Sequence, residues 1–393
     1  MTRLWEKGLP LAERVLRYTA GEDHLLDARL VAYDVRGSTA HAEMLAATGL
    51  ISKEDCTAIC NGLAELEKSF DAGDWSITLE DEDVHTALES RLTQAVGDAG
   101  ARLHLGRSRN DQVLTALRLY LRDAAADLSG RIDSLRESIA GLSSRQGDVE
   151  LPGYTHMQHA MPSSVALWCG GFDEALADSV AGLGSSRRRI NKNPLGSAAG
   201  YGTPGLPLDR DMTTKKLGFD EAQSPVTAAQ LSRGKAESTL LFEITLLLQD
   251  LGRMATDLLL FYTQEFAYIS LAADVTTGSS IMPQKRNPDV LELLRASSAT
   301  AQACLDESLM ITAKLQSGYQ RDLQRLKAPL FRSIDLAIDS VDIMAYLLDG
   351  LSFLPENITL DPGSYATEEA YKLVTENGLP FRDAYRQVAE KYK

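Results

Sequence analysis

The segment TTGSSIMPQKRNP, residues 276–288, combines cations, hydroxyls and amides but has no helical or strand periodicity. Its glycine, serines and prolines are typical of a loop. Asn287 suits the cap of a following helix and Pro288 its first position, and an apolar helical pattern comes next. The loop would therefore carry Lys285 and Arg286 beside a helix N-terminus, which suits the binding of a carboxylate. The alternative from composition is a plain polar connection between two helices.

Two further polar segments stand before predicted helices. HLGRSRNDQV, residues 104–113, places arginines and an asparagine beside a glycine, which suits recognition of carboxylates by paired donors. YTHMQ, residues 154–158, places His156 in a predicted loop, and a histidine can transfer protons near neutral pH. The alternatives, on residue types alone, are a capped helix start with solvated arginines and a structural histidine.

Hydrophobic residues recur at spacings of three and four along most of the chain, which predicts an all-α fold. The longest such pattern is apolar over a wide face, as expected of a helix in the core of a bundle. Such helices need partners, so we expect an oligomer. Loops are predicted at residues 146–162 and, rich in glycine and proline, at 193–210. Helices are predicted at residues 11–19, 23–48, 52–70, 84–96, 111–144, 163–192, 228–266 (the longest pattern), 289–315 and 329–351, and a helical hairpin at residues 367–393.

The composition is ordinary for a soluble globular protein, with 44% hydrophobic and 24% charged residues. A net charge of −15 argues against non-specific binding to nucleic acid or anionic membranes. The four cysteines are too few and scattered for a disulfide framework, and no cluster with histidine completes a metal site. Residues 1–10 lack the apolar core of a signal peptide, and charged residues interrupt the most apolar stretch, 240–261. These features predict a cytoplasmic protein.

Taken together, the motifs resemble those of argininosuccinate lyases in the fumarase/aspartase superfamily. GSSIMPQKRNP resembles the signature loop of the superfamily, and MPQK followed by RNPD favours argininosuccinate lyase over fumarase and adenylosuccinate lyase. GRSRNDQV matches an argininosuccinate lyase segment, and the resemblance runs from LWEKG near the N-terminus to LPFRDAYRQVAEKY near the C-terminus. It implies a long central helical bundle at residues 107–357, with smaller helical domains at 1–106 and 358–393. Family members usually continue further, so we expect the last domain to be truncated.

The resemblance also implies an activity and an assembly. The reaction would cleave a C–N bond in L-argininosuccinate to give fumarate and L-arginine, a step of arginine biosynthesis, with no metal or organic cofactor. The chain would form a homotetramer whose active sites take the regions around residues 109, 156 and 279 from three different subunits. No nucleic-acid or membrane partner is expected.

Residue types and resemblance disagree about the catalytic base. His156 is the better candidate from chemistry alone, because an unperturbed serine hydroxyl is a very weak base. The resemblance implies instead that Ser279 removes the proton once its loop closes, while His156, paired with Glu292, serves the leaving nitrogen. Lys285 would stabilise the charge that builds on the carboxylate. The other site residues that the resemblance implies are His85, Ser108, Arg109, Asn110, Thr155, Asn287, Tyr319, Gln324 and Lys327.

Two departures from the family pattern leave rival hypotheses open. Asp23 stands where many members have serine, and QHAMP, with His159 and Met161, stands where many have QRAQP. Both changes could alter recognition of the distal end of the substrate, where Asp23 could pair with a cation. The first rival is therefore a fumarate-releasing lyase acting on another N-succinyl compound, and the second is a non-catalytic structural protein. Without the resemblance, His85 is a helix-surface histidine and the Tyr319 segment is a solvated face.

Overall fold

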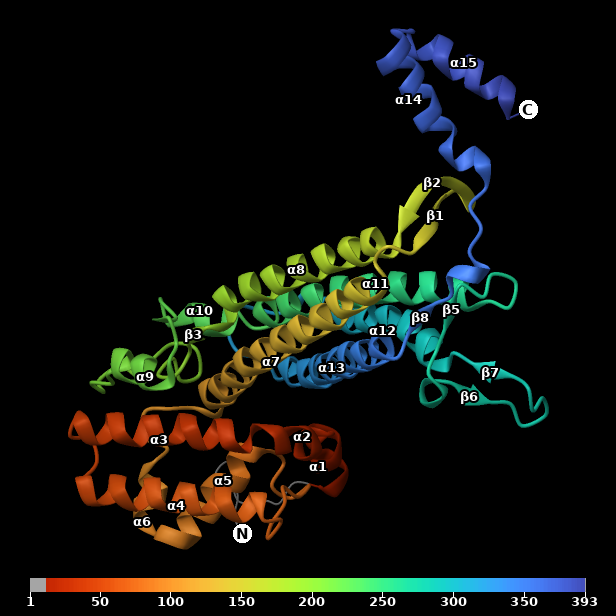
Figure 1. Ribbon diagram of the computed structural model, residues 1–393. Coiled ribbons are helices and arrows are strands. Elements are labelled where there is room, and N and C mark those ends of the chain that lie inside the picture. The colour runs from red at the N-terminus through yellow and green to blue at the C-terminus, as the bar shows by residue number, and fades with distance from the viewer. Residues whose placement is uncertain (1–11, 393) are drawn as a thin grey trace. The chain divides into compact units, whose positions relative to one another are not determined.

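The computed structural model describes residues 12–392; the opening LWEKG segment and Lys393 lie outside them. This part of the chain is mainly helical, which confirms the predicted all-α class (Figure 1). Its α-helices are α1 (Glu13–Ala20), α2 (Asp23–Leu26), α3 (Val31–Ala47), α4 (Lys53–Asp71), α5 (Val84–Val96), α6 (Asp98–Arg102), α7 (Arg109–Gln146), α8 (Val165–Ile190), α9 (Arg210–Leu217), α10 (Thr227–Leu231), α11 (Lys235–Tyr262), α12 (Asp289–Thr312), α13 (Lys327–Asp349), α14 (Ala366–Asn377) and α15 (Phe381–Lys391).

The other elements of the described chain are short. The 3-10 helices are η1 (Asp27–Leu30), η2 (Ala273–Val275), η3 (Arg321–Leu326), η4 (Pro355–Asn357) and η5 (Pro362–Tyr365). The strands pair two by two: β1 (Glu150–Thr155) with β2 (Gln158–Ser164), β3 (Lys192–Asn193) with β4 (Glu221–Ala222), β5 (Ile269–Ser270) with β8 (Ser352–Phe353), and β6 (Thr277–Gly278) with β7 (Arg286–Asn287).

The chain forms two compact units, each made of three segments. The first unit consists of Met1–Asp127, Gly182–Ile244 and Ala301–Asp335, and the second of Leu128–Ala181, Thr245–Thr300 and Leu336–Lys393. The long helices α7, α8, α11, α12 and α13 each contribute one part to the first unit and the other part to the second. The domains predicted from the family resemblance, with boundaries after residues 106 and 357, are continuous segments of the chain, whereas the two compact units are not. The predicted domain boundaries stay a prediction.

In the first unit, α3, α4 and α5 pack together around the fully buried side chains of Leu45, Ile59 and Leu92. Ser52 caps α4, because its hydroxyl accepts a hydrogen bond from the backbone N–H of Asp55 at 2.9 Å, as the spacing predicts. This small core fixes the position of the start of α5.

In the second unit, parts of the long helices pack side by side. Leu251, Met254 and Leu258 of α11 are completely buried, at the spacing of three and four that the sequence predicts. Trp168 of α8 donates a hydrogen bond from its indole N–H to the carboxylate of Asp257 at 3.0 Å, which joins α8 to α11. Charged residues of this kind interrupt the apolar helices, and none of the helices within residues 12–392 could cross a membrane.

The predicted loop at residues 146–162 is wrong over most of its length, because β1 and β2 form an antiparallel hairpin there. Pro152 and Pro162 stand opposite each other at a shift in the register. Proline in a strand is tolerated at such irregularities, where a missing N–H costs least. Gly153 follows, and a Cβ there would lie 2.6 Å from the carbonyl oxygen of Met161, so only glycine fits. The hairpin was predicted as a loop because its prolines and glycine are residues that are typical of loops.

Candidate active site

A cavity of about 160 Å³ in the first unit collects charged side chains from five separate segments of the chain. The segments are α2, the start of α5, the start of α7, the connection between α10 and α11, and the region around η3. The predicted site residues that line it are His85, Arg109, Asn110, Tyr319, Gln324 and Lys327. Its other lining residues are Asp23, Asp83, Val113, Arg233 and Arg321.

The start of α7 is held in place by Asp111, which is fully buried. One oxygen of its carboxylate accepts the N–H of Ser108 at 2.9 Å, and the other accepts the N–H groups of Gly196 (2.9 Å) and Ala198 (2.7 Å). Burial raises the pKa of Asp111, although these N–H donors oppose the shift. The hydroxyl of Ser108 accepts the N–H of Asn110 at 3.3 Å. Ser108 therefore shapes the turn and does not line the cavity, while Asp111 joins that turn to the Gly-rich loop before α9.

Arg109 forms an ion pair with Asp83 in the cavity wall. Asp83 also caps α5, because its carboxylate accepts the backbone N–H of Thr86 at 2.9 Å. Burial opposes ionisation of Asp83, but the charges of Arg109 and His85 outweigh it and hold the pKa of Asp83 well below its usual range. The helix cap thus fixes Asp83, and Asp83 in turn orients the guanidinium group of Arg109.

His85 is only 2% exposed, so the helix-surface alternative is wrong. Its Nδ1 forms an ion pair with Asp34, which also accepts hydrogen bonds from Gln112 (3.0 Å) and Ser38 (2.9 Å). Burial disfavours the charged imidazole, but Asp34 outweighs this effect and raises the pKa of His85. His85 Nε2 has no hydrogen-bond partner in the described part of the chain. A histidine that is held at one ring nitrogen and free at the other can exchange a proton with a ligand.

Lys327 is buried between two carboxylates. Its Nζ lies 2.6 Å from Asp27 Oδ1 and 2.9 Å from Asp23 Oδ2. Burial opposes the charge of Lys327, but the two carboxylates outweigh it and raise the pKa of Lys327. Burial raises the pKa of Asp23 to about 6, although Lys327 opposes the shift. Because Asp27 is the closer partner of Lys327, Asp23 gains less from the ion pair than it loses by leaving water.

The segment around η3 forms another part of the cavity wall. Gln324 donates a hydrogen bond from its amide to the carbonyl oxygen of Thr19 at 2.8 Å. Arg321 donates to the same carbonyl at 2.9 Å and lies 3.4 Å from a carboxylate oxygen of Glu82. Tyr319 is half-buried before η3. These contacts attach η3 to the end of α1, so the alternative of a merely solvated polar face is wrong.

In the second unit, residues 276–288 form a short hairpin in which Thr277 pairs with Asn287. Helix α12 begins only at Asp289, so the prediction that Asn287 caps this helix is wrong. Pro288 explains the difference, because a residue before proline is restricted to extended backbone, and Asn287 therefore continues the strand.

Ser279 stands at the start of the hairpin tip between β6 and β7. Its Oγ accepts the backbone N–H groups of Ile281 at 3.3 Å and Met282 at 3.1 Å. Two N–H donors directed at a serine oxygen stabilise the negative charge that forms when the hydroxyl loses its proton. Ile281 is 85% exposed, and Lys285 is exposed as well. The tip therefore holds its polar groups in solvent in the single chain.

Lys285, Asn287 and Glu292 line a second hollow of about 780 Å³ beside the start of α12. A cation and an amide at a helix N-terminus suit a carboxylate ligand. Ser279 and His156 do not line this hollow. No hydrogen bond or ion pair joins Glu292 to His156 in the described residues of the single chain, so their pairing stays a prediction.

His156 and Met157 form the two-residue turn of the β1–β2 hairpin. Their φ angles are +53° and +61°, which matches a type I′ turn but is unfavourable for residues other than glycine. Both side chains and the preceding Thr155 are exposed. Backbone strain of this kind is common where a turn must present a side chain for function.

The departures from the family pattern at His159 and Met161 lie on β2 of this hairpin. His159 Nε2 and the hydroxyl of Tyr154 share a hydrogen bond of 2.9 Å, and burial raises the pKa of Tyr154 to about 12. Met161 is 56% exposed. His159 therefore has a structural contact on the hairpin.

Asp83, Arg233 and Arg321 line the cavity but were absent from the predicted site. Asp83 could have been found as the cap of a predicted helix, and Arg321 lies inside a segment already singled out. No sequence pattern pointed to Arg233 as a site residue, because residues 228–266 have the pattern of one continuous helix. The structure contradicts this prediction with a break between α10 and α11. The break includes Gly234 at φ +79°, where a Cβ would lie 2.2 Å from Thr312.

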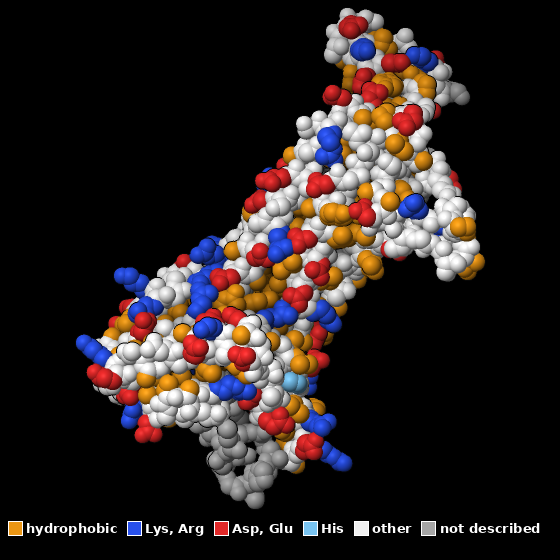
Figure 2. Space-filling model, turned by 60° about the horizontal axis from the view of Figure 1, so that its bottom comes forward, with side chains coloured by type: hydrophobic (Ala, Val, Ile, Leu, Met, Phe, Trp, Pro, Cys, Tyr) orange, Lys and Arg blue, Asp and Glu red, His pale blue; other side chains and the backbone are white. Residues whose placement is uncertain are grey.

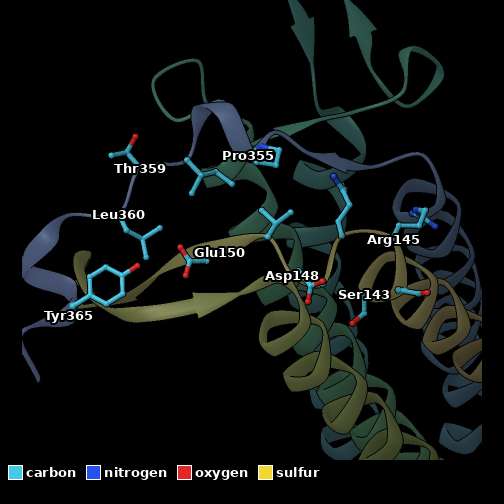
Figure 3. A pocket seen from close by; sticks show the side chains of 13 residues that line it. Ser143, Arg145, Asp148, Glu150, Pro355, Thr359, Leu360 and Tyr365 are labelled. Carbon is cyan, nitrogen blue, oxygen red and sulfur yellow. The ribbon is translucent and has the colours of Figure 1, made fainter. Parts of the chain in front are cut away.

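A hollow in the second unit, with a volume of about 890 Å³, is lined by none of the predicted site residues. Figure 3 shows the side chains that line it. The hollow lies between the end of α7 and the connection that contains η4 and η5. Arg145 donates to the carbonyl oxygen of Leu348 at 3.2 Å, and Gln146 exchanges two hydrogen bonds of 2.8 Å with the backbone of Phe353. Arg145 and Gln146 therefore use their polar groups to bind the backbone of neighbouring connections. The large volume of this hollow does not by itself make it a candidate site.

Comparison with known proteins first gives the class. A family model described as "Lyase" matches residues 14–303. The crystal structure of EDDS lyase in complex with formate superposes with a TM-score of 0.82 at 27% identity, over 97% of this chain and 76% of that one. A class II fumarase from Schistosoma mansoni superposes with a TM-score of 0.80 at 20% identity, over 98% of this chain and 90% of that one. The fold is therefore that of the fumarase-type lyases.

Closer relatives narrow the class. The chain is 43% identical over 389 residues to an argininosuccinate lyase of Sorangium cellulosum, covering 98% of this chain and 90% of that one. It is 40% identical over 392 residues to an argininosuccinate lyase of Thermotoga neapolitana, covering 99% of this chain and 98% of that one. The chain belongs to the argininosuccinate lyase family.

Proposed function

We propose that this chain converts L-argininosuccinate reversibly into fumarate and L-arginine. The observation that carries the proposal is its 43% identity over 389 residues with the argininosuccinate lyase of Sorangium cellulosum. The cavity of the first unit supports it, because paired cations and carboxylates suit a substrate that bears carboxylates, an amine and a guanidinium group. The proposed reaction uses no metal or organic cofactor.

In the proposed reaction, Ser279 acts after its hydroxyl has lost a proton to solvent, and the resulting alkoxide takes a proton from the carbon beside a carboxylate of the succinyl group. The electrons of that C–H bond form the C=C bond of fumarate while the C–N bond breaks and its electron pair leaves with the guanidine nitrogen. The N–H groups of Ile281 and Met282 support this role, because they already point at the serine oxygen. Lys285 and Asn287 would stabilise the charge that builds on the carboxylate.

His156 would supply the proton that the departing nitrogen needs, with Glu292 orienting its ring. The exposed position of His156 on a tight turn supports this role, because the side chain is accessible to a neighbouring molecule. The other proposed substrate ligands are His85, Arg109, Asn110, Thr155, Tyr319, Gln324 and Lys327. Ser108, also predicted as a ligand, lies outside the cavity lining and shapes the turn that carries Arg109 and Asn110.

A homotetramer with active sites shared between subunits is part of the proposal. The cavity of about 160 Å³ is smaller than the roughly 300–1,000 Å³ of most ligand sites, so it suits one wall of a larger site. Large apolar side chains are exposed on the long helices, and Figure 2 shows groups of hydrophobic side chains between charged ones. The exposed apolar side chains of the long helices include Phe242, Leu246, Leu293, Leu309 and Met310. We place this enzyme in arginine biosynthesis in the cytoplasm.

The test is fumarate release, followed by ultraviolet absorbance, when the purified protein is given argininosuccinate and a panel of other N-succinyl compounds. We expect turnover with argininosuccinate to exceed that with the rest. Preference for another N-succinyl compound would support the second candidate, which the 27% identity with EDDS lyase and the change at Asp23 favour. An intact assembly that releases no fumarate from any compound would support the non-catalytic alternative.

A further inference from the structure

Arg233 differs from the other cationic side chains that line the cavity of the first unit. Within residues 12–392, each of the others has a carboxylate partner, and Arg233 has none. The pairs are His85 with Asp34, Arg109 with Asp83, Arg321 with Glu82, and Lys327 with Asp27. Arg233 is therefore the cavity cation whose charge the described chain leaves unbalanced.

The burial of Arg233 makes this imbalance costly. The residue is 5% exposed, and its Nε and Nη1 are shielded from solvent without a hydrogen-bond partner in the described chain. A buried charge without a counter-charge is among the most unfavourable arrangements in a protein interior. Such a group is retained where a ligand supplies the missing charge.

A second buried arginine, Arg118, is close enough to Arg233 for their charges to repel. Arg118 is 1% exposed, and burial lowers the pKa of Arg118 to about 10; Glu237 opposes this shift and Arg233 adds to it. Glu237 uses one carboxylate oxygen to accept the N–H of Gly234 at 2.7 Å, and no ion pair joins it to Arg233 in the described chain. Arg118 donates its hydrogen bonds to Lys192, Gln223 and Ser232. Within residues 12–392, Glu237 thus forms an ion pair with neither buried arginine.

Arg233 lines the cavity beside Tyr319. It lies in the break between α10 and α11, and its guanidinium carbon is 5.7 Å from the centre of the Tyr319 ring. The ring limits where the guanidinium group can move, and a planar guanidinium binds a carboxylate through two parallel hydrogen bonds.

We propose that Arg233 binds a carboxylate of the substrate inside this cavity. The inference rests on the proposed function, because the substrate named there carries carboxylates on both its amino-acid and its succinyl portions. Arg109 and Lys327 are weaker candidates for this role, since Asp83 and Asp27 already neutralise them.

The test is a titration of the melting temperature of the full chain with L-arginine, agmatine and succinate, which yields a dissociation constant for each ligand. Agmatine lacks the carboxylate of arginine. The variants are Arg233→Gln and Arg233→Lys, and the matched control is Arg325→Gln, which removes an exposed arginine of η3 that does not line the cavity.

We expect Arg233→Gln to weaken one carboxylate ligand roughly 10- to 100-fold, the effect of losing a charged hydrogen-bond pair. Weaker arginine binding with unchanged agmatine binding would assign Arg233 to the amino-acid carboxylate. Weaker succinate binding would assign it to the succinyl carboxylate. Arg233→Lys keeps the charge without the fork, so its loss should be smaller, and this variant retains the test if Arg233→Gln does not fold.

The inference is overturned if the folded Arg233 variants bind arginine and succinate as tightly as Arg325→Gln does. Because melting shifts do not require turnover, this outcome is distinct from failure of the proposed function. A wild-type protein that releases no fumarate from argininosuccinate, but whose ligand binding still depends on Arg233, would remove the function and leave the carboxylate site.

Discussion

The cavity of the first unit and the hairpin at residues 276–288 of the second unit carry similar residue types in opposite surroundings. In the cavity, Lys327 and Asp27 are 2% and 0% exposed and are paired with each other. On the hairpin, Lys285 is exposed and Ile281 is 85% exposed. The charged groups of the first region are buried and paired within the folded chain. Those of the second region stay exposed to solvent.

In the proposed function, this difference in exposure would separate substrate binding in the cavity from proton transfer at the hairpin. Buried pairs such as Lys327–Asp27 cost desolvation but are fixed in position, which suits the orientation of a substrate. Exposed loop tips have few buried contacts and move readily, which suits a group that must close over the substrate before it reacts. Substitutions in the cavity should therefore affect both stability and substrate binding, and substitutions on the hairpin should affect turnover without changing stability.

The largest expected effect is on the hairpin. Ser279→Ala removes the proposed base, so kcat should fall roughly 10²- to 10⁴-fold while the melting temperature stays unchanged. Fumarate release and thermal unfolding measure the two quantities. Ser280→Ala is the matched control, because it removes the neighbouring hydroxyl and should retain wild-type turnover. A Ser279→Ala protein with most of its activity would rule out the proposed base.

In the cavity, Lys327→Met should destabilise the fold by about 3–5 kcal/mol, because it leaves Asp23 and Asp27 buried without their cation. Urea unfolding measures the change. Lys216→Met is the control, since its ion pair with Glu43 is partly exposed and should contribute little. Equal stability of the two variants would mean that the cavity wall is not set by this buried pair.

Sequence patterns predict the helices around the cavity, but not how the cavity is assembled, nor that the predicted loop at residues 276–288 pairs as a hairpin. Helix patterns depend on neighbouring residues, so the all-α fold class was predictable from spacing. Arg109 and Lys327 were predicted from the resemblance to argininosuccinate lyases, and not from the helix pattern. The pair Asp83–Arg109 joins residues that are distant in the chain, and no local pattern shows it. Arg233 was missed because the break beside it depends on the close approach of Gly234 to Thr312.

The next effect depends on pH. Asp23 has a usual pKa of 3.8, and burial raises it to about 6 in the folded chain. The folded state therefore binds more protons than the unfolded state between these values, and the free energy of unfolding falls as pH rises from 4 to 6. Asp23→Asn does not titrate, so its stability relative to wild type should increase by about 1–3 kcal/mol between pH 4 and pH 7. Urea unfolding at both values checks this, and a difference independent of pH would contradict it.

The smallest effect concerns the turn that carries His156. Met157→Gly should stabilise the hairpin by up to about 1 kcal/mol, because φ +61° is unfavourable for methionine and free for glycine. Thermal unfolding measures the gain. Gln158→Gly lies in regular strand β2 and should destabilise instead. A loss of stability in Met157→Gly would show that this backbone is not strained.

The central claim is that the cavity and the hairpin complete one active site across different subunits, and mixing two inactive variants tests it most directly. Arg109→Gln disables the cavity and Ser279→Ala disables the hairpin, so neither protein alone should release fumarate at a useful rate. After the two are dissociated and reassembled together, some sites take both regions from intact copies, and fumarate release should reappear. If mixed tetramers form, as native mass spectrometry would show, but activity stays at the sum of the two parents, the shared site is contradicted.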